Sequence, residues 1–425
     1  MVRDGGVLIR DGVIEAVGRE RDLPPCDDAP VTDMGDAVLI PGLVDAHCHL
    51  EWALMGGLVP DARFGEWLGS FVRRTAEVTP ADREAAARYG ALMALRHGTT
   101  TLADSGPSGF GVGAATAAGL RAVVHMEIFG RDSGAEAREK VTRHGEAVLA
   151  ARDAAGPRVR VGVSPHSPYT VGPALWAEVL ADPILGAGSV ATHVAESPDE
   201  VMLLDGGVGP LVDAIRSVGR DPARWPGGGP GVISRLDAGG ALAPGLIAAH
   251  CVQVDEGDAA VLADHDVRVV HCPHSNMRLE CGDAPIEMLE ALGVTVGLGT
   301  DSPASAGAYD MRDEARWAAE VAARRGARPV AADMLAMATM GSARVLGMDD
   351  QLGSLVPGKR ADIVAIRPAE DAPLEADPQL AVLDPRAKVV AAWVDGQQVL
   401  DADEAVLLDG PAIVAGATEA RDRIM

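Results

Sequence analysis

Two histidines one residue apart are the first residues of this chain whose type and spacing can do chemistry. His47 and His49 stand at the end of an apolar run, in "PGLVDAHCHLE" (41–51). Side chains two residues apart on a strand share one face, roughly 6–7 Å apart, and two imidazoles placed so can bind one cation. By itself the pair is as consistent with exposed or hydrogen-bonded histidines as with a metal site. The rest of the sequence has to distinguish these two interpretations.

Further side chains of this kind follow other apolar runs. They are His166, His193, His250, His271, His274 and Asp301. With His193 and Asp301 added to the first pair, three histidines and one carboxylate form a set that suits Zn²⁺ or Fe²⁺ and leaves room for water. The chain has three lysines, Lys140, Lys359 and Lys388, and none stands at the end of one of these apolar runs, which disfavours a second metal bridged through a carbamylated lysine. The sequence therefore predicts one divalent metal ion, Zn²⁺ first and Fe²⁺ as the alternative.

Two residues near this set can handle protons. Glu196 follows His193 by three positions in "THVAES", where a carboxylate can take a proton from water and pass it to a substrate nitrogen. The alternative for Glu196 is an exposed loop residue. His250 lies on an otherwise apolar run, and we expect it to contact the water or the developing oxyanion rather than serve only as a core histidine.

Short apolar runs alternate with helix-like stretches from residue 38 to about 347, and these elements must position the side chains above. The runs are nearly continuously apolar, as parallel strands buried on both faces are. They lie at 38–47, 99–105, 120–130, 158–167, 188–197, 245–251, 267–273 and 294–302. A helix between them, at 79–98, has Thr79 as its N-cap, Pro80 in its first turn and Gly98 at its end. This alternation predicts an α/β fold, a (β/α)8 TIM barrel, with an open doubly wound sheet as the alternative.

The two ends of the chain depart from this alternation. "GGVLIRDGVIEAVG" is typical of a β-hairpin with Asp11 and Gly12 in its turn, and residues 353–400 contain further strands with glycine turns. We expect both ends to build one small β-sandwich domain, from residues 1–40 and 348–425, beside a barrel at 41–347. A loop-rich section at about 200–245 is expected to be an insertion beside the active site.

Charge and cysteine usage narrow the class of protein. The net charge of −25 argues against nucleic acids and anionic membranes as partners, because both would be repelled. The five cysteines are scattered without a CxxC pair, which indicates a reducing compartment. The N-terminus lacks a secretory apolar region, and no run reaches the roughly 20 apolar residues that span a bilayer. We therefore expect a cytoplasmic protein that acts on a small molecule.

Taken together, the motifs resemble those of the amidohydrolase superfamily, in its branch of metal-dependent nucleoside and base deaminases. The similarity covers essentially the whole chain, through "PGLVDAHCHLE", "HGTTTLAD", "SPHSPYTV", "THVAES", "AHCV", "HCPHSN", "LGTDSPAS" and "GSLVPGKRADIVAI". It implies that the metal ligands are His47, His49, His193 and Asp301. It also implies that Glu196 is the proton shuttle, and that His250 and Asp301 orient and deprotonate the water. Related chains usually carry one more strand before the hairpin, so this start is expected to lack it.

Within this branch, "HLEWALMGG", "EIFG" and "GTDSPAS" are most similar to the aminodeoxyfutalosine deaminases of menaquinone biosynthesis. The implied reaction converts aminodeoxyfutalosine to futalosine. Ser302 supports this group, since adenosylhomocysteine deaminases more often have glycine there, whereas His274 stands where the futalosine group has arginine. The resemblance gives Glu66 a role in binding ribose hydroxyls and His166 a contact with the base. Further candidates for substrate contacts are Glu127, His274 and Asn276.

Other functions remain open at this point. Another deaminase of the branch would act on adenosylhomocysteine, methylthioadenosine, adenosine, guanine or a pterin. A hydrolase with the same site would displace chloride or open a cyclic amide. A non-catalytic binding protein on a barrel scaffold is disfavoured by the complete set of ligands and acid–base groups. The expected partners are a nucleoside-like substrate and water, and the sequence leaves open whether the chain forms a homodimer.

Overall fold

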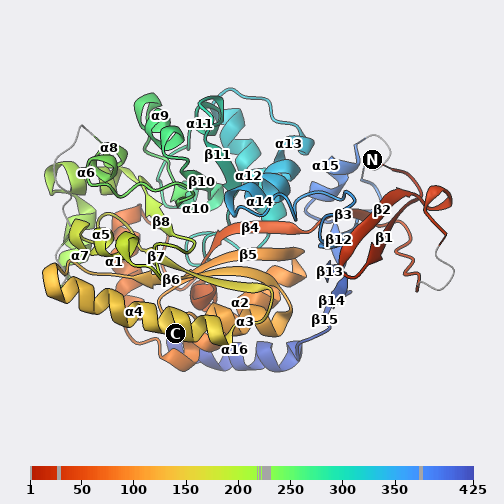
Figure 1. Ribbon diagram of the computed structural model, residues 1–425, viewed down its shortest axis with the longest axis horizontal. Coiled ribbons are helices and arrows are strands. Elements are labelled where there is room, and N and C mark those ends of the chain that lie inside the picture. Colours follow the sequence, from red (N-terminus) through yellow and green to blue (C-terminus); the bar gives the residue numbers. More distant parts are fainter. Residues whose placement is uncertain (1, 26–29, 218, 220–221, 223–230, 373–376) are drawn as a thin grey trace.

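The computed structural model describes residues 2–25, 30–217, 219, 222, 231–372 and 377–425. Figure 1 shows a large helix-covered barrel and, beside it, a smaller group of strands that combines the beginning of the chain with a segment close to its end. Among the described helices, none is both long enough and apolar enough to cross a membrane.

Eight parallel strands form the barrel. They are β4 (Leu43–Cys48), β5 (Thr99–Gly106), β6 (Arg121–Ile128), β7 (Val159–Pro165), β8 (Ala191–Val194), β9 (Ile247–His250), β10 (Arg268–His271) and β11 (Thr295–Leu298). They pair in chain order as two four-stranded sheets. Isolated bridges join β7 to the residue before β8, at Val163–Val190, and β4 to the segment after β11, at Cys48–Asp301. The sheets therefore meet at both seams. The predicted barrel is confirmed, because in a doubly wound sheet the strand order reverses.

The second seam brings the beginning and the end of the barrel together at the predicted metal site. The backbone N–H of His49 donates to the carbonyl of Asp301, and that of Asp301 donates to the carbonyl of His47, both at 3.0 Å. A Cβ atom on Gly299 would lie 2.7 Å from the His47 carbonyl oxygen, so only glycine permits this close approach. The seam thus fixes Asp301 beside His47, within β4, and His49, directly after it.

Helices cover the outside of the barrel. They are α1 (Phe64–Thr75), α2 (Pro80–Arg96), α3 (Phe110–Ala118), α4 (Gly134–Ala154), α5 (Pro173–Ala181), α6 (Pro198–Gly206), α7 (Pro210–Ser217), α8 (Val232–Ala238), α9 (Glu256–Asp264), α10 (Pro273–Arg278), α11 (Ile286–Ala291), α12 (Met311–Arg324), α13 (Ala331–Ala336) and α14 (Ser342–Val345), with short helices η2 (Leu50–Met55) and η3 (Met337–Gly341). One further short helix, η1 (Glu20–Asp22), follows β2 (Val13–Arg19) in the small β unit. The predicted cap of α2 is confirmed: the Thr79 hydroxyl accepts from the Asp82 N–H at 3.2 Å, and the Asp82 carboxylate accepts from the Thr79 N–H at 3.1 Å. The expected insertion at about 200–245 contains α7 and α8, and its residues 223–230 lie outside the described part of the chain.

The small β unit draws on both ends of the chain, as predicted. Its strands are β1 (Gly5–Arg10), β2 (Val13–Arg19), β3 (Val38–Pro41), β12 (Ile363–Arg367), β13 (Lys388–Val394), β14 (Gln397–Asp401) and β15 (Glu404–Ala405), with α15 (Pro378–Leu383) between β12 and β13. One layer is a five-stranded sheet in the order β15-β14-β13-β12-β3, and the hairpin β1-β2 packs on it through Ile14 against Ala361 and Ile363. Asp11 and Gly12 have φ of 51° and 77°, the positive values that a type I′ hairpin turn requires.

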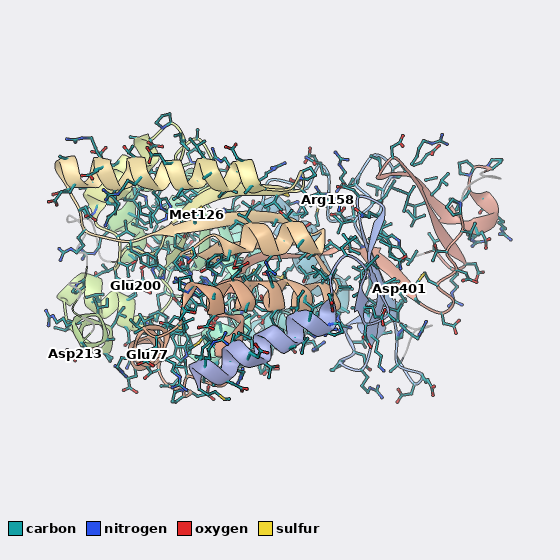
Figure 2. The ribbon with its side chains drawn as sticks, turned by 90° about the horizontal axis from the view of Figure 1, so that it is seen from below. Glu77, Met126, Arg158, Glu200, Asp213 and Asp401 are labelled. Carbon is teal, nitrogen blue, oxygen red and sulfur yellow. The ribbon has the colours of Figure 1, made fainter. Side chains whose placement is uncertain are left out.

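The last helix returns to the barrel. Helix α16 (Gly410–Ile424) lies along α2 and η2, although the expected limits assign residues 348–425 to the small domain (Figures 1 and 2). Arg421 donates to the carbonyl oxygens of Leu54 and Gly56 at 3.2 and 2.8 Å, and Arg423 binds Asp82 at 2.7 Å. The segment that follows the small sheet therefore supports η2, which leads directly out of the predicted metal site.

Ion pairs connect the barrel to the small sheet, where Figure 2 labels Arg158. Arg121 binds Asp362 at 3.1 Å and Asp395 at 2.7 Å, and Arg158 binds Asp395 at 2.8 Å.

We expect Arg121→Met to lower the free energy of unfolding by about 3–5 kcal/mol, because it leaves the buried Asp362 carboxylate without its cation. Urea unfolding measures this. Arg10→Met, which breaks an exposed pair with Glu15, is the control and should leave the transition unchanged; equal transitions for both variants would contradict the prediction.

Candidate active site

A cavity of about 1250 Å³ opens at the carboxyl ends of the barrel strands. Seven of the predicted site residues line it: His49, Glu127, His166, His193, Glu196, His250 and Asp301. His47 lies next to them, with its ring centre 4.7 Å from that of His49 and 4.9 Å from that of His193. Residues 254 positions apart in the chain, from His47 to Asp301, thus meet at one end of the barrel.

Two imidazoles are oriented by backbone carbonyl groups. The Nδ1 atoms of His49 and His193 lie 2.7 Å from the carbonyl oxygens of Ser105 and His166. Because a carbonyl oxygen only accepts, both Nδ1 atoms carry hydrogen and donate. The two Nε2 atoms then face each other at 3.1 Å. Burial lowers the pKa of His193 well below its usual range, so its Nε2 offers a lone pair, as metal-binding histidines do.

The other two predicted ligands complete the group. The Nε2 atom of His47 is buried and has no hydrogen-bond partner among the described residues. One carboxylate oxygen of Asp301, Oδ1, lies 3.4 Å from the Nε2 atom of His49. The other, Oδ2, accepts from the hydroxyls of Ser275 at 2.6 Å and Ser305 at 2.8 Å, which hold the carboxylate in place. Buried nitrogen and oxygen donors that converge in this way fit one divalent cation.

Glu196 and His250 lie beside this group. Burial raises the pKa of Glu196 well above its usual range, and the nearby carboxylates of Asp301 and Glu200 add to the effect. Its Oε1 atom is 3.7 Å from the Nε2 atom of His250. A carboxyl group whose pKa is raised holds its proton more readily and can donate it to a basic nitrogen of a substrate. Glu196 is therefore a buried acid within the cavity and not an exposed loop residue.

The backbone is strained where these side chains leave the strands. Ala195, His250, Cys251 and Asp301 have φ of 50°, 76°, 45° and 57°, in the left-handed region that residues other than glycine rarely adopt. Such conformations cost about 1–3 kcal/mol each and collect at functional sites. The strain lets Glu196, His250 and Asp301 point into the cavity at the point where their strands end.

Two of the predicted substrate contacts also line the cavity. Glu127, at the end of β6, is buried, and burial raises its pKa well above its usual range. The ring of His166 lies against that of Phe129 with the centres 4.7 Å apart, and its Nδ1 is 2.9 Å from the Thr170 hydroxyl. Both side chains border the cavity, and the ring contact and the hydrogen bond hold His166 in position.

The remaining three predicted substrate contacts lie outside the cavity wall. Glu66 is exposed on α1, because Phe64 and Trp67 occupy the face of the helix that packs inward. The ring of His274 lies on Trp317 of α12, with the centres 4.9 Å apart. Asn276 is buried and bonds to His250, so its nearest role is to hold a histidine and not a substrate.

Aromatic residues of the wall were missed by the sequence reasoning. Six of the chain's thirteen aromatic residues line the cavity: Trp52, Phe64, Trp67, Phe71, Phe129 and Tyr169. The Phe71 ring lies 5.1 Å from that of Trp67 and 5.4 Å from that of Trp52. The four-residue spacing of Trp67 and Phe71 was a signal that both lie on one face of a helix.

Basic residues also line this cavity, although the chain is acidic overall. They are Arg73, Arg83, Arg131 and Lys140. Lys140 pairs with Asp132, and Arg83 lies 3.9 Å from Glu51, whereas Arg73 and Arg131 form no ion pair with any described residue. The cavity thus combines an apolar aromatic wall with positive charge that is available to an anionic group.

Comparison with known proteins identifies relatives over most of the chain. A sequence model of the Amidohydrolase family matches residues 38–399. The chain is 34% identical, over 85% of its length and 80% of the relative's, to a 5-methylthioadenosine/S-adenosylhomocysteine deaminase of Symbiobacterium thermophilum. It is 33% identical, over 86% and 81% of the two chains, to a 5′-deoxyadenosine deaminase of Methanothermobacter thermautotrophicus.

Two solved structures are similar over nearly the full length. An adenosine deaminase from Xanthomonas campestris with bound zinc has a TM-score of 0.82 and 31% identity, and the match covers 99% of this chain and 94% of that one. An atrazine chlorohydrolase from Arthrobacter aurescens complexed with zinc has a TM-score of 0.78 and 24% identity, with coverage of 98% and 95%. The second likeness concerns the fold alone.

Proposed function

The chain belongs to the amidohydrolase family, and on that premise we propose that it is a metal-dependent hydrolytic deaminase of an adenine nucleoside with a substituent at its 5′ position. Such an enzyme acts on the carbon–nitrogen bond of a cyclic amidine. The observation that carries the proposal is the pair of Nε2 atoms, of His49 and His193, that face each other at 3.1 Å with the buried acid Glu196 in the same cavity.

We assign the metal site to His47, His49, His193 and Asp301, and we propose Zn²⁺, with Fe²⁺ as the alternative. The fit rests on the unpartnered Nε2 atom of His47 and on the carbonyl-bound Nδ1 atoms of the other two histidines. A divalent cation in this position would lower the pKa of a water molecule toward 7.

The protein's own groups then move the protons. Asp301 accepts a proton from the attacking water, and the hydroxyls of Ser275 and Ser305 on Oδ2 hold its carboxylate in place for this step. The water oxygen bonds to the amidine carbon while Glu196 gives its proton to the adjacent ring nitrogen. The proton held by Asp301 then passes to the exocyclic amine, which leaves as ammonia as the carbon–nitrogen bond breaks. Glu196 recovers its proton from the hydroxyl that becomes the carbonyl of the product. His250 accepts a hydrogen bond from the water at Nε2 and orients the water oxygen toward the amidine carbon.

The cavity supports a substrate larger than adenosine. Its volume of about 1250 Å³ exceeds the roughly 300–1,000 Å³ of sites that bury a drug-sized ligand. The aromatic wall offers stacking surface to an apolar or planar group beyond the ribose. Arg73 and Arg131 offer charge to a carboxylate at the far end of that group.

Two finer assignments fit this description. The names of the relatives favour 5′-methylthioadenosine, S-adenosylhomocysteine or 5′-deoxyadenosine as the substrate. The aromatic wall and the sequence motifs favour aminodeoxyfutalosine, which would place the enzyme in menaquinone biosynthesis. A chlorohydrolase remains the alternative reaction for the same cavity, and Glu196 disfavours it, because loss of chloride does not require a proton at the leaving group.

Ammonia release from the zinc-loaded protein tests the proposal. The substrates to compare are aminodeoxyfutalosine, S-adenosylhomocysteine, 5′-methylthioadenosine, 5′-deoxyadenosine and adenosine. A kcat/KM at least about a hundredfold higher for one 5′-substituted compound, equivalent to about 2.7 kcal/mol, identifies the substrate. Equal rates on all five would support the assignment as a deaminase but would show that the enzyme does not recognise the 5′ substituent. If none of them releases ammonia and atrazine releases chloride, the proposed function is a chlorohydrolase and not a deaminase.

The aromatic wall yields a prediction of its own. We expect Phe71→Leu to lower kcat/KM for the preferred 5′-substituted nucleoside by about fivefold, through KM, because about 1 kcal/mol of stacking is lost. Adenosine, which lacks the substituent, should be affected less than twofold. Phe110→Leu, at a phenylalanine outside the cavity wall, is the matched control. Equal losses for both nucleosides would show that Phe71 does not contact the substituent.

A further inference from the structure

Helix α10 supports two groups of the proposed deamination machinery through adjacent side chains. The Ser275 hydroxyl donates to Oδ2 of Asp301 at 2.6 Å, and Oδ1 of Asn276 lies 2.8 Å from Nδ1 of His250. Asp301 and His250 themselves follow β11 and end β9. One short helix therefore contacts side chains that come from two other parts of the barrel.

The contact with Asn276 determines which nitrogen of His250 carries the hydrogen. An amide oxygen only accepts, so Nδ1 of His250 donates and Nε2 carries the lone pair. That Nε2 atom points toward the cavity, 3.7 Å from Oε1 of Glu196, and lies within the group of ligand atoms formed with His47 and His193. With the opposite tautomer, Nε2 would present a hydrogen to these groups and could not accept one from water.

The surroundings make this hydrogen bond the controlling contact. His250 and Asn276 are each 1% exposed, so bulk water does not compete for either side chain. Asn276 provides the one hydrogen bond to Nδ1 of His250 among the described residues. The backbone of Asn276 is fixed as well, because its N–H donates to the carbonyl of Cys272 at 3.0 Å and its carbonyl accepts from Cys281 at 2.8 Å. By contrast, Asp301 has a second hydroxyl partner in Ser305.

We infer that Asn276 is a positioning residue of the reaction: it fixes His250 as the tautomer with hydrogen on Nδ1, so that Nε2 can accept a hydrogen bond from the attacking water. This role rests on the proposed deaminase, and it differs from the substrate contact expected for Asn276 from the sequence. The residue acts through His250 and does not line the cavity.

Two substitutions separate this role from a merely structural one. Asn276→Leu keeps a similar volume and removes the acceptor, whereas Asn276→Asp keeps an oxygen in the same place. We expect Asn276→Leu to lower kcat by about 10- to 100-fold with KM within about threefold, as for other residues that orient a histidine at a metal site. Asn276→Asp should restore kcat to within about tenfold of the original. Met277→Leu, on the same helix and outside the cavity wall, is the matched control.

A spectroscopic measurement is independent of turnover. Nitrogen-15 NMR of the histidine rings in the zinc-loaded protein reports the tautomer, and the signal of His250 is identified by its loss in His250→Gln. The inference requires hydrogen on Nδ1 in the original protein and in Asn276→Asp, and hydrogen on Nε2 in Asn276→Leu. Hydrogen on Nε2 in the original protein, or an unchanged tautomer in Asn276→Leu, would overturn it. If the tautomer changes as expected but no nucleoside releases ammonia, the proposed function fails and the positioning of His250 by Asn276 remains.

Discussion

Glu196→Gln is expected to lower kcat for ammonia release by about a thousandfold while the content of bound metal stays unchanged. Because the amide has nearly the volume of the carboxyl group, we expect the buried backbone around Ala195 and Glu196 to keep its conformation. It cannot, however, give a proton to the ring nitrogen and take it up again, and general acid–base catalysis of this kind contributes about 10²–10⁴-fold. The KM should change little, because the lost interaction belongs to the transition state.

Steady-state kinetics together with elemental analysis of the metal measures this. Glu146→Gln, at an exposed carboxylate on α4, controls for the loss of one charge and should match the original protein. A Glu196→Gln variant with full activity would show that another group shuttles the proton and would remove the central step of the mechanism. A variant that loses its metal would instead assign Glu196 to the metal site.

His193→Ala is expected to abolish both metal binding and activity. His193 belongs to two of the three groups of possible ligand atoms, and its Nε2 is the partner that faces His49. With one of four ligands removed, the bound metal should fall from about one per chain to less than about one tenth. Removal of metal from the original protein with a chelator should have the same effect on activity, and added Zn²⁺ should reverse it.

Stability gives a second readout for this prediction. A cation that binds only the folded state adds about 4 kcal/mol when its free concentration is a thousandfold above Kd. The melting temperature of the original protein should therefore rise with added Zn²⁺, and that of His193→Ala should not. His265→Gln, at a half-exposed histidine on the outer surface, is the control and should retain the response to Zn²⁺. A full response in His193→Ala would mean that the cation binds elsewhere.

Several features were set by neighbours in the sequence and were predicted correctly. The eight apolar runs became the barrel strands, because a strand buried on both faces has no polar positions to alternate with. The Thr79–Asp82 cap and the Asp11–Gly12 turn formed because their donors, acceptors and backbone angles lie within four residues of each other. The spacing of His47 and His49 places their rings near each other, with centres 4.7 Å apart, although β4 ends at Cys48 and only His47 lies within it.

Rotation of a helix about its axis was not determined by local sequence. Glu66 and Trp67 are neighbours in the chain, but successive residues point about 100° apart around a helix. Packing of Phe64 and Trp67 against the barrel turned Glu66 to the solvent and brought the aromatic side of α1 to the cavity. That outcome depended on the surface against which α1 packs, which residues distant in sequence provide.

The sequence by itself thus determined the fold class and which side chains stand at the strand ends, since both follow from residue types at short spacing. Only the tertiary structure decided how those side chains face one another. The 3.1 Å approach of two Nε2 atoms, the two serines on Asp301 and the bond from His250 to Asn276 each join segments far apart in the chain. Their geometry is set by closure of the barrel and by helix packing, because hydrogen bonds and metal ligands require positions defined to a few tenths of an ångström.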